Sequence, residues 1–186
     1  MKYKIILSSN SPRRKELLAG LDLDYEVRVM DGIDESYPHD LPASEIPVYI
    51  SKKKAAAYTI AEGELVLTAD TVVVLGDEVL GKPKDETDAK RMLRELSGKT
   101  HQVITGVCLT TTNKQQAFAV TTDVTFKILT DEEIDYYVTQ YKPLDKAGAY
   151  GIQEWIGYIG VTSLNGSYFN VMGLPVQRIY EALNNF

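Results

Sequence analysis

The segment Lys4–Leu18, KIILSSNSPRRKELL, joins an apolar run of strand length to a short polar loop and then to the start of a helix. Ser11 is a favourable N-cap residue, and Pro12 suits the first helical position, where a missing N–H costs nothing. Apolar residues then recur at helical spacing, which predicts that one face of the helix packs inward. These residues are Leu17, Leu18 and Leu21.

The start of this helix is a candidate phosphate cradle. Unpaired N–H groups at a helix N-terminus favour anions, and Arg13 and Arg14 add forked donors that suit phosphate oxygens. An ordinary capped helix with solvated arginines fits the same residues equally well. The segment has no glycines, which argues against a P-loop and against a dinucleotide fingerprint.

The composition is ordinary for a globular protein, and the net charge argues against broad nucleic-acid binding, so we expect no nucleic-acid partner. The chain has 186 residues, of which 44% are hydrophobic and 25% charged, and its net charge is −6. Broad nucleic-acid binding needs a basic surface, whereas a local basic cleft for a small anion is compatible with this charge. Cys108 is the only cysteine, so neither an internal disulfide nor a cysteine-based zinc site is expected. The chain shows neither an 18-residue apolar run nor a signal-peptide pattern, so we expect a cytoplasmic protein with no membrane partner.

Asp70 is placed unusually, between the apolar runs Glu64–Ala69 and Val72–Leu75. An ionised carboxylate is costly to bury without a partner. We therefore expect Asp70 to bind a metal or another cation, to transfer a proton, or to lie in a cleft. A structural turn aspartate is the alternative, because the pattern ends the first strand at Asp70-Thr71 and starts another directly afterwards.

The remaining pattern predicts alternating helices and strands without an independent second domain, so we expect one domain over residues 1–186. A hairpin is expected to pair Ile156–Leu164 with Ser167–Met172 through the turn Asn165-Gly166. Ser44 is expected to cap the second helix. Helices are predicted over residues 12–21, 45–61, 87–97, 131–140 and 173–183, and further strands over 25–29, 78–80, 100–110 and 117–129.

Several polar residues outside Lys4–Leu18 have two interpretations. The run Lys52-Lys53-Lys54 is normally an exposed helix face, although one lysine could turn toward a site. His101 stands alone, and a plain hydrogen-bonded histidine is favoured. Lys82, before Pro83, is expected in extended backbone. Gln153 could recognise the edge of a base with its amide, or its glycine-rich segment could be a tight connector.

In their order and spacing these residues resemble the Maf family of nucleoside triphosphate pyrophosphatases. The resemblance covers nearly the whole chain and rests on the blocks Ser11–Leu18, Ala69–Val73, Gly81–Pro83, Leu96–Gly98 with His101, Asp145–Gln153 and Met172–Pro175.

The resemblance implies an α/β fold with a mixed, elongated central sheet, flanking helices and two lobes around a deep cleft, of the inosine-triphosphatase-like type. It implies hydrolysis of a nucleoside triphosphate to the monophosphate and pyrophosphate. The cofactor would be Mg²⁺ or another divalent metal such as Mn²⁺. It also suggests a homodimer.

The resemblance assigns roles to individual residues. Glu35 and Asp70 match the acidic pair that holds the metal, and Asp70 would accept the proton. Asp34 remains an alternative to Glu35, as Lys52 and Lys53 do to Lys54. The positions that match phosphate contacts are Ser11, Arg13, Arg14, Lys54 and Lys82, of which Lys82 is also assigned to catalysis.

The resemblance further points to the branch that acts on dTTP and UTP, with CTP or modified pyrimidine triphosphates as further candidates. Arg13, Thr71 and Gln153 match the positions of that branch, whereas a glutamate in place of Gln153 would indicate 7-methyl-GTP. Two departures are visible. Ser8 replaces the usual alanine, and Glu154-Trp155 follows Gln153 where many members have glycine.

We expect water to attack the α-phosphorus, with pyrophosphate leaving, while the cationic side chains and the metal neutralise the developing charge. Attack at the γ-phosphorus is an enzymatic alternative and would release orthophosphate. A further alternative is a nucleotide-binding regulator of septum formation without significant turnover.

Overall fold

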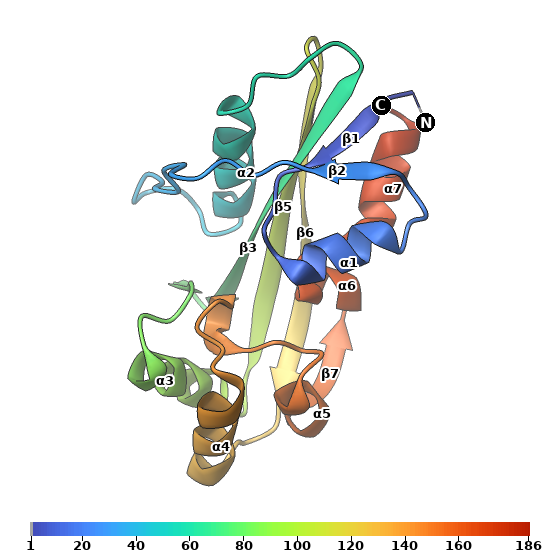
Figure 1. Cartoon of the computed structure of the whole chain (residues 1–186). Coiled ribbons are helices and arrows are strands. Elements are labelled where there is room, and N and C mark those ends of the chain that lie inside the picture. Colours follow the sequence, from blue (N-terminus) through green and yellow to red (C-terminus); the bar gives the residue numbers. More distant parts are fainter. Residues whose placement is uncertain (1) are drawn as a thin grey trace. The chain divides into compact units, whose positions relative to one another are not determined.

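The computed structural model describes residues 2–186 and contains a mixed sheet with flanking helices (Figure 1), which confirms the α/β class. The strands are β1 (Lys4–Leu7), β2 (Tyr25–Val27), β3 (Glu64–Leu75), β4 (Glu78–Leu80), β5 (Thr100–Thr110), β6 (Gln115–Phe126) and β7 (Val161–Asn165). The helices are α1 (Pro12–Ala19), α2 (Ile46–Ala56), α3 (Glu86–Leu96), α4 (Asp131–Tyr141), α5 (Trp155–Gly160), α6 (Tyr168–Met172) and α7 (Val176–Asn184), with a 3₁₀ turn, η1, at Ala147–Ala149.

Hydrogen bonds order the strands as β2-β1-β3-β5-β6-β7, with β4 paired to β3. The chain divides into two compact units. Unit 1 comprises residues 2–71, 105–120 and 173–186, and unit 2 comprises residues 72–104 and 121–172. The single domain over residues 1–186 stays a prediction. Within residues 2–186 no helix has both the length and the apolar character needed to cross a bilayer.

In unit 1, β1 is a central parallel strand. It pairs with β2 on one side and with β3 on the other, so Ile5 lies between Tyr25 and Leu65. A strand with neighbours on both sides and covered faces is apolar throughout, and Ile5, Ile6 and Leu7 are all buried. Helix α1 follows as predicted, with the Ser11 side chain accepting from the Arg14 N–H and Pro12 in the first turn.

Helix α2 packs closely against β5 in unit 1. A Cβ added to Gly106 would lie 2.2 Å from the Pro47 carbonyl carbon, so glycine permits this contact. The buried Ser51 hydroxyl donates to Gly106 O at 2.9 Å and to Pro47 O at 2.7 Å. The helix begins at Ile46 after Glu45, which makes no side-chain cap bond, so the predicted Ser44 cap and the end at residue 61 are wrong.

Unit 2 is built around the apolar faces of α3 and α4. The α3 side chains Ala89, Met92, Leu93 and Leu96 are buried in one cluster with residues of α4. Thr130 and Glu133 form a capping box at the start of α4. Gly98, which follows α3, has φ +67, a backbone conformation common for a glycine just after the end of a helix.

Two local predictions are corrected. Strand β3 continues through Asp70 and Thr71 without a break. The predicted hairpin over residues 156–172 is wrong, because α5 precedes β7 and α6 follows it. Burial decides this segment: Ile156 packs into the unit 2 core, and the buried Asn170 side chain donates to Val103 O at 3.1 Å. These tertiary contacts override the strand propensity of the isoleucines and aromatic residues.

Candidate functional site

Asp70 is a largely buried acid in unit 1. Its side chain is 14% exposed, and Lys54 Nζ lies 3.1 Å from its Oδ1 atom. Lys54 is in the last turn of α2, and its own side chain is 13% exposed. The cation that lies beside Asp70 is thus a lysine from a helix that precedes β3 in the chain.

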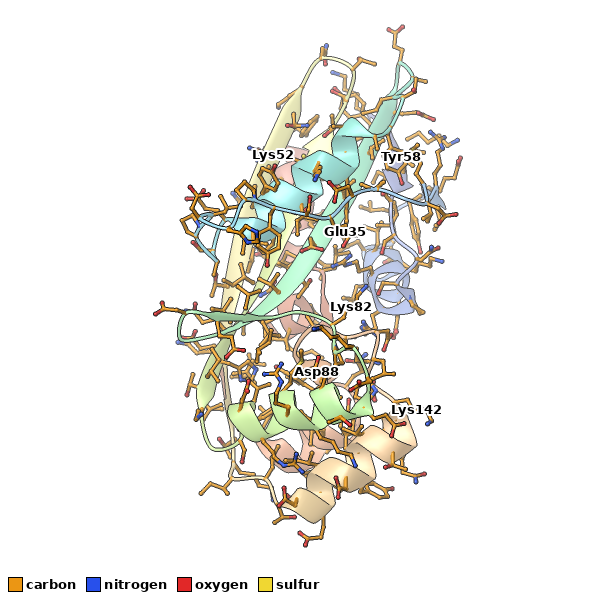
Figure 2. The ribbon with its side chains drawn as sticks, turned by 90° about the vertical axis from the view of Figure 1, so that its left-hand side faces the viewer. Glu35, Lys52, Tyr58, Lys82, Asp88 and Lys142 are labelled. Atoms are coloured by element: carbon orange, nitrogen blue, oxygen red, sulfur yellow. The ribbon has the colours of Figure 1, made fainter. Side chains whose placement is uncertain are left out.

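Glu35 lies in the loop between β2 and α2 (Figure 2). Its Oε1 atom is 3.1 Å from Lys54 Nζ, so it contacts the same lysine. Two carboxylates therefore converge on one ammonium group. Asp34 does not join them, since it pairs with Lys53 at 2.6 Å. Lys52 is exposed. The structure thus places Glu35 and Lys54 beside Asp70.

Burial dominates the electrostatics of Asp70. Loss of solvation raises the pKa of its carboxyl above the ordinary value, while the charges of Lys54 and Arg14 act in the opposite direction. Glu35 adds a smaller push upward. Buried acids held between opposing influences of this kind are frequent at functional sites.

Arg14 is anchored beside Asp70 in unit 1. Its Nε donates to Gly173 O at 2.8 Å, its Nη1 to Ala69 O at 3.0 Å and its Nη2 to the Thr71 hydroxyl at 3.1 Å. These bonds engage three of the five N–H groups of the guanidinium. Arg14 therefore fixes the backbone next to Asp70, and its contact with phosphate stays a prediction.

Ser11 and Arg13 lie at the start of α1, in the same unit. The Ser11 side chain accepts from Arg14 N at 3.4 Å as the cap, and its own N–H donates to Ser9 Oγ at 3.2 Å. Burial lowers the pKa of Arg14, and the positive charge of Arg13 adds a smaller effect in the same direction. Cationic side chains and a capped helix start thus occur in the unit that holds the acids.

Thr71 is engaged by two side chains. Its hydroxyl accepts from Arg14 and lies 2.9 Å from the hydroxyl of Thr105, which is fully buried on β5. The sequence analysis did not identify Thr105. A threonine in an apolar strand carries no local signal of such a contact, because β-branched residues are common in strands.

Lys82 lies in unit 2, in an exposed segment between β4 and α3. The preceding Gly81 carbonyl accepts from Gly148 N at 3.1 Å, which ties the lysine segment to the η1 turn. Gly148 has φ +69, and a Cβ there would lie 2.8 Å from Val73 Cγ2. The glycine is thus required by both its backbone conformation and its packing.

Gln153 follows η1 in unit 2 and carries an orphaned acceptor. Within residues 2–186 its Oε1 atom is buried and has no hydrogen-bond partner. The adjacent Glu154 does not compete for a ligand, because its carboxylate lies 2.9 Å from Lys146 Nζ and accepts from the Tyr137 hydroxyl at 3.3 Å. A buried amide oxygen of this kind can accept a hydrogen bond from an N–H or O–H group of a bound ligand.

His101, also in unit 2, is a structural residue, as predicted. It is 1% exposed, its Nε2 lies 2.6 Å from the Tyr150 hydroxyl, and its ring packs edge-on against Phe126. Burial lowers the pKa of His101 to about 4, so the imidazole is neutral near pH 7.

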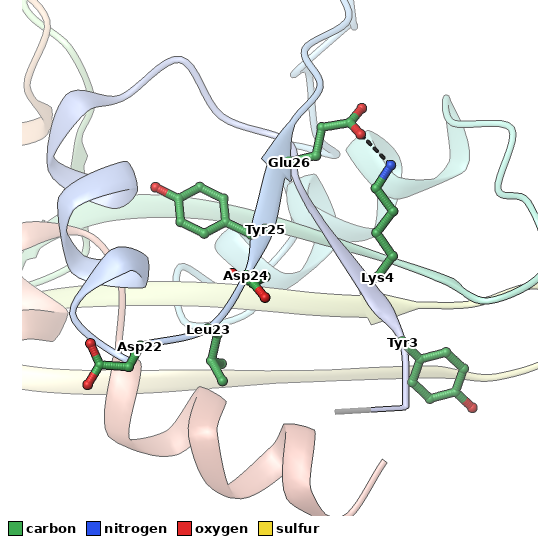
Figure 3. A pocket seen from close by; sticks show the side chains of 7 residues that line it. All are labelled: Tyr3, Lys4, Asp22, Leu23, Asp24, Tyr25 and Glu26. Atoms are coloured by element: carbon green, nitrogen blue, oxygen red, sulfur yellow. Dashed lines mark ion pairs between the residues drawn. The ribbon is translucent and has the colours of Figure 1, made fainter.

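A separate pocket of about 460 Å³ lies in unit 1 (Figure 3) and contains none of the predicted site residues. The pocket and the predicted site lie at opposite ends of β1. The pocket is next to Lys4, where β1 starts, whereas Ser11 comes after the end of the strand. Lys4 and Glu26 in its wall already form an ion pair. Its lining residues are Tyr3, Lys4, Asp22, Leu23, Asp24, Tyr25 and Glu26.

The similarity to known proteins extends over nearly the whole chain. The family model described as "Maf-like protein" matches residues 4–186. A protein of Phocaeicola vulgatus named dTTP/UTP pyrophosphatase is 65% identical, and the alignment covers 98% of this chain and 95% of that protein. Proteins with the same name are 60% identical in Bacteroides thetaiotaomicron, over 98% of this chain and 95% of the relative, and 52% identical in Porphyromonas gingivalis, over 100% and 95%.

Among solved structures, a nucleoside-triphosphatase / dITP/XTP pyrophosphatase from Mycobacterium abscessus matches with a TM-score of 0.48 and 13% identity, covering 97% of this chain and 94% of that chain. A structural similarity at this level gives no information about the site.

Proposed function

This chain belongs to the Maf-like protein family, and on that premise we propose that it is a nucleoside triphosphate pyrophosphatase that hydrolyses dTTP and UTP to the monophosphate and pyrophosphate. The observation that carries the proposal is the convergence of Glu35 and Asp70 on Lys54 Nζ, each at 3.1 Å. The names of the relatives support the substrate class.

The proposed site uses cations to hold a polyanion. Arg13 and Arg14 at the start of α1 and Lys54 beside Asp70 lie in unit 1. Lys82 belongs to unit 2, and its contact with phosphate stays a prediction. Phosphoryl-type transfer depends on positioning and on neutralising charge more than on covalent help. These side chains supply such neutralisation, with the Ser11 hydroxyl as a further contact.

Two carboxylates fit a Mg²⁺ ion that is shared with the substrate. No cluster of three or more His, Cys, Asp or Glu side chains suited to a metal occurs among residues 2–186, so an all-protein cage is not expected. Mg²⁺ prefers oxygen ligands, retains several waters and is commonly held by one or two carboxylates plus substrate phosphates. Glu35 and Asp70 would hold it, and Mn²⁺ could replace it. When bound, the metal would neutralise charge on the phosphates.

Asp70 is the proposed general base. Its buried carboxylate has a raised pKa, and a base with a raised pKa accepts a proton more readily than an ordinary aspartate. It would orient and deprotonate the water that attacks the α-phosphorus. Arg14 holds the Ala69 carbonyl and the Thr71 hydroxyl on either side of Asp70, which keeps the carboxylate in place.

Gln153 is the proposed recognition group for the base. Thymine and uracil each have a ring N–H that the orphaned Oε1 atom can accept from. Thr71 and Arg13 are proposed to support the same preference, as the resemblance implies.

A panel of ordinary and modified triphosphates tests the proposal. The purified protein is incubated with each compound and Mg²⁺, and pyrophosphate and orthophosphate are both measured. We expect pyrophosphate from dTTP and UTP and a loss of activity with a chelator. Orthophosphate alone would indicate attack at the γ-phosphorus. Binding without product would indicate a regulator of cell division. The enzyme names of the relatives do not favour this second outcome.

We further propose that the enzyme works in the cytoplasm and as a homodimer. Analytical ultracentrifugation tests the second statement, and a single species with the mass of one chain would contradict it.

A further inference from the structure

The Tyr58 hydroxyl makes three hydrogen bonds in unit 1. It donates to Arg28 O at 2.9 Å, and it accepts from Met30 N at 3.2 Å and from Ser8 Oγ at 2.6 Å. Tyr58 lies two residues after the end of α2 (Figure 2). Only 9% of it is exposed. These bonds use the full capacity of a phenol group, which is one donor and its acceptor lone pairs.

These contacts lie where the chain leaves the sheet after β2. Arg28 N still donates to Leu7 O at 3.1 Å, which continues the β1–β2 ladder by one bond. Of the backbone groups that follow, the Arg28 carbonyl and the Met30 N–H bond to the Tyr58 hydroxyl. Because backbone groups seek such partners, the hydroxyl fixes the direction in which the loop departs.

The Tyr58 ring holds the same loop at a second point. It is buried in a cluster with Ile6 and Val66, and Ile33 packs against that cluster. Ile33 is two residues before Glu35. The loop is thus attached at Arg28 and Met30 by hydrogen bonds and at Ile33 by apolar contact.

Glu35 depends on this attachment because its own contact is weak. Its side chain is 53% exposed, and exposed ion pairs contribute little to holding a side chain in place. We propose that Tyr58 is a positioning residue that holds the loop over residues 28–35 so that Glu35 stays beside Asp70. Ser8, the serine in place of the usual alanine, assists by orienting the Tyr58 hydroxyl.

The proposal rests on the function proposed above, and Tyr58→Phe tests it. The substitution removes the hydroxyl and keeps the ring, so the cluster around Ile6 and Val66 remains. We expect kcat for dTTP to fall about tenfold, since small displacements of catalytic groups reduce rates strongly. The half-saturating Mg²⁺ concentration should rise severalfold, while KM changes less than kcat. Backbone amide exchange at Met30 and across residues 31–36 should become faster.

Two further variants make the test specific. Ser8→Ala removes one of the three hydrogen bonds and should give a smaller change in the same direction. Tyr180→Phe, at an exposed position on α7 in the same unit, makes the same chemical change and should leave both kinetics and amide exchange unaltered. A Tyr58→Phe protein with the kcat and Mg²⁺ dependence of the parent would overturn the proposal.

Amide exchange separates this proposal from the proposed function. If the parent protein releases no pyrophosphate, the proposed function fails, and the exchange rates still decide the role of Tyr58. Faster exchange over residues 28–36 in Tyr58→Phe supports the attachment, and unchanged exchange refutes it.

Discussion

At the scale of single residues, Asp70 combines burial with two nearby cations. Its side chain is 14% exposed and lies 3.1 Å from Lys54 Nζ, while Arg14 binds the carbonyl of the preceding residue. A buried ion pair gives weak evidence for stability, because the cost of desolvating both charges offsets their attraction. The ion pair alone therefore does not account for burying Asp70, which agrees with the catalytic role proposed above.

Replacement of Asp70 by Asn tests this explanation. The side chain keeps its size and loses the ability to accept a proton, so we expect kcat to fall by about 10²–10⁴-fold, the usual contribution of general-base catalysis. The measurement is pyrophosphate release from dTTP, with circular dichroism as a check on folding. A folded Asp70→Asn protein with the parent rate would exclude Asp70 as the base.

Replacement of Lys54 by Met separates this lysine from its neighbours. Because the Lys54 cation opposes the effect of burial, its loss should raise the pKa of the Asp70 carboxyl further in the metal-free protein. A carboxyl-detected NMR titration measures this change. Lys53→Met is the matched control, since Lys53 pairs with Asp34, and it should leave the Asp70 titration unchanged. Equal effects of the two variants would contradict the assignment.

At the scale of elements, α2 positions two residues of the proposed site, Lys54 and Tyr58. Its last turn carries Lys54, and Tyr58 lies two residues after its end. The helix is set against β5 by Gly106 and by the Ser51 hydroxyl, which bonds to Gly106 O. Any shift of α2 from β5 would therefore move the lysine away from Asp70.

Gly106→Ala tests the fit between α2 and β5. The new methyl group would lie 2.2 Å from the Pro47 carbonyl carbon and 2.3 Å from Val48 N, and neither backbone atom can move without moving the helix. We expect a loss of about 1–3 kcal/mol in the free energy of unfolding, the usual cost of overpacking, together with reduced kcat. Urea unfolding measures the first quantity.

Gly20→Ala is the control for that substitution. Gly20 has right-handed helical backbone angles, and its added methyl group would be no closer than 3.4 Å to another atom. Its unfolding free energy should change by less than about 0.5 kcal/mol. Similar losses in the two variants would show that the close contact at Gly106 is not the cause.

At the scale of the whole molecule, His101 links stability to pH. The pKa of His101 is lowered to about 4 by burial, whereas an unfolded histidine titrates near pH 6.5. Between these values the unfolded chain binds a proton that the folded chain does not bind. Stability therefore falls as pH decreases from about 6.5 to about 4.

The contribution of His101 is measurable by unfolding at several pH values. We expect the titration of His101 to lower the free energy of unfolding by up to about 3 kcal/mol at pH 4. Each unit of pKa difference between the folded and unfolded states corresponds to about 1.4 kcal/mol. His101→Gln can keep a hydrogen bond to Tyr150 and does not titrate, so its curve should fall less steeply than that of the parent. A constant difference between the two proteins from pH 7 to pH 4.5 would rule out this linkage.

Local patterns in the sequence were sufficient for several elements and for the kinds of residue at the site. The cap at Ser11 and the box at Thr130 and Glu133 involve residues a few positions apart, so the chain itself specifies them. The need of Asp70 for a partner also followed from its apolar neighbours. Resemblance to a family then selected candidates for roles that single residues do not reveal.

Contacts between distant segments decided the rest. A run of like charges does not show whether Lys54 or Lys52 lies near Asp70, nor whether Glu35 or Asp34 does. Only the placement of α2 beside β3 distinguishes them. The segment at residues 156–172 has the composition of strands, yet burial of Ile156 and Asn170 makes parts of it helical. Thus the sequence alone determined the element types with local signals and the chemistry of the candidate residues. The tertiary structure determined which charges meet, because burial and long-range hydrogen bonds depend on segments that are far apart in the chain.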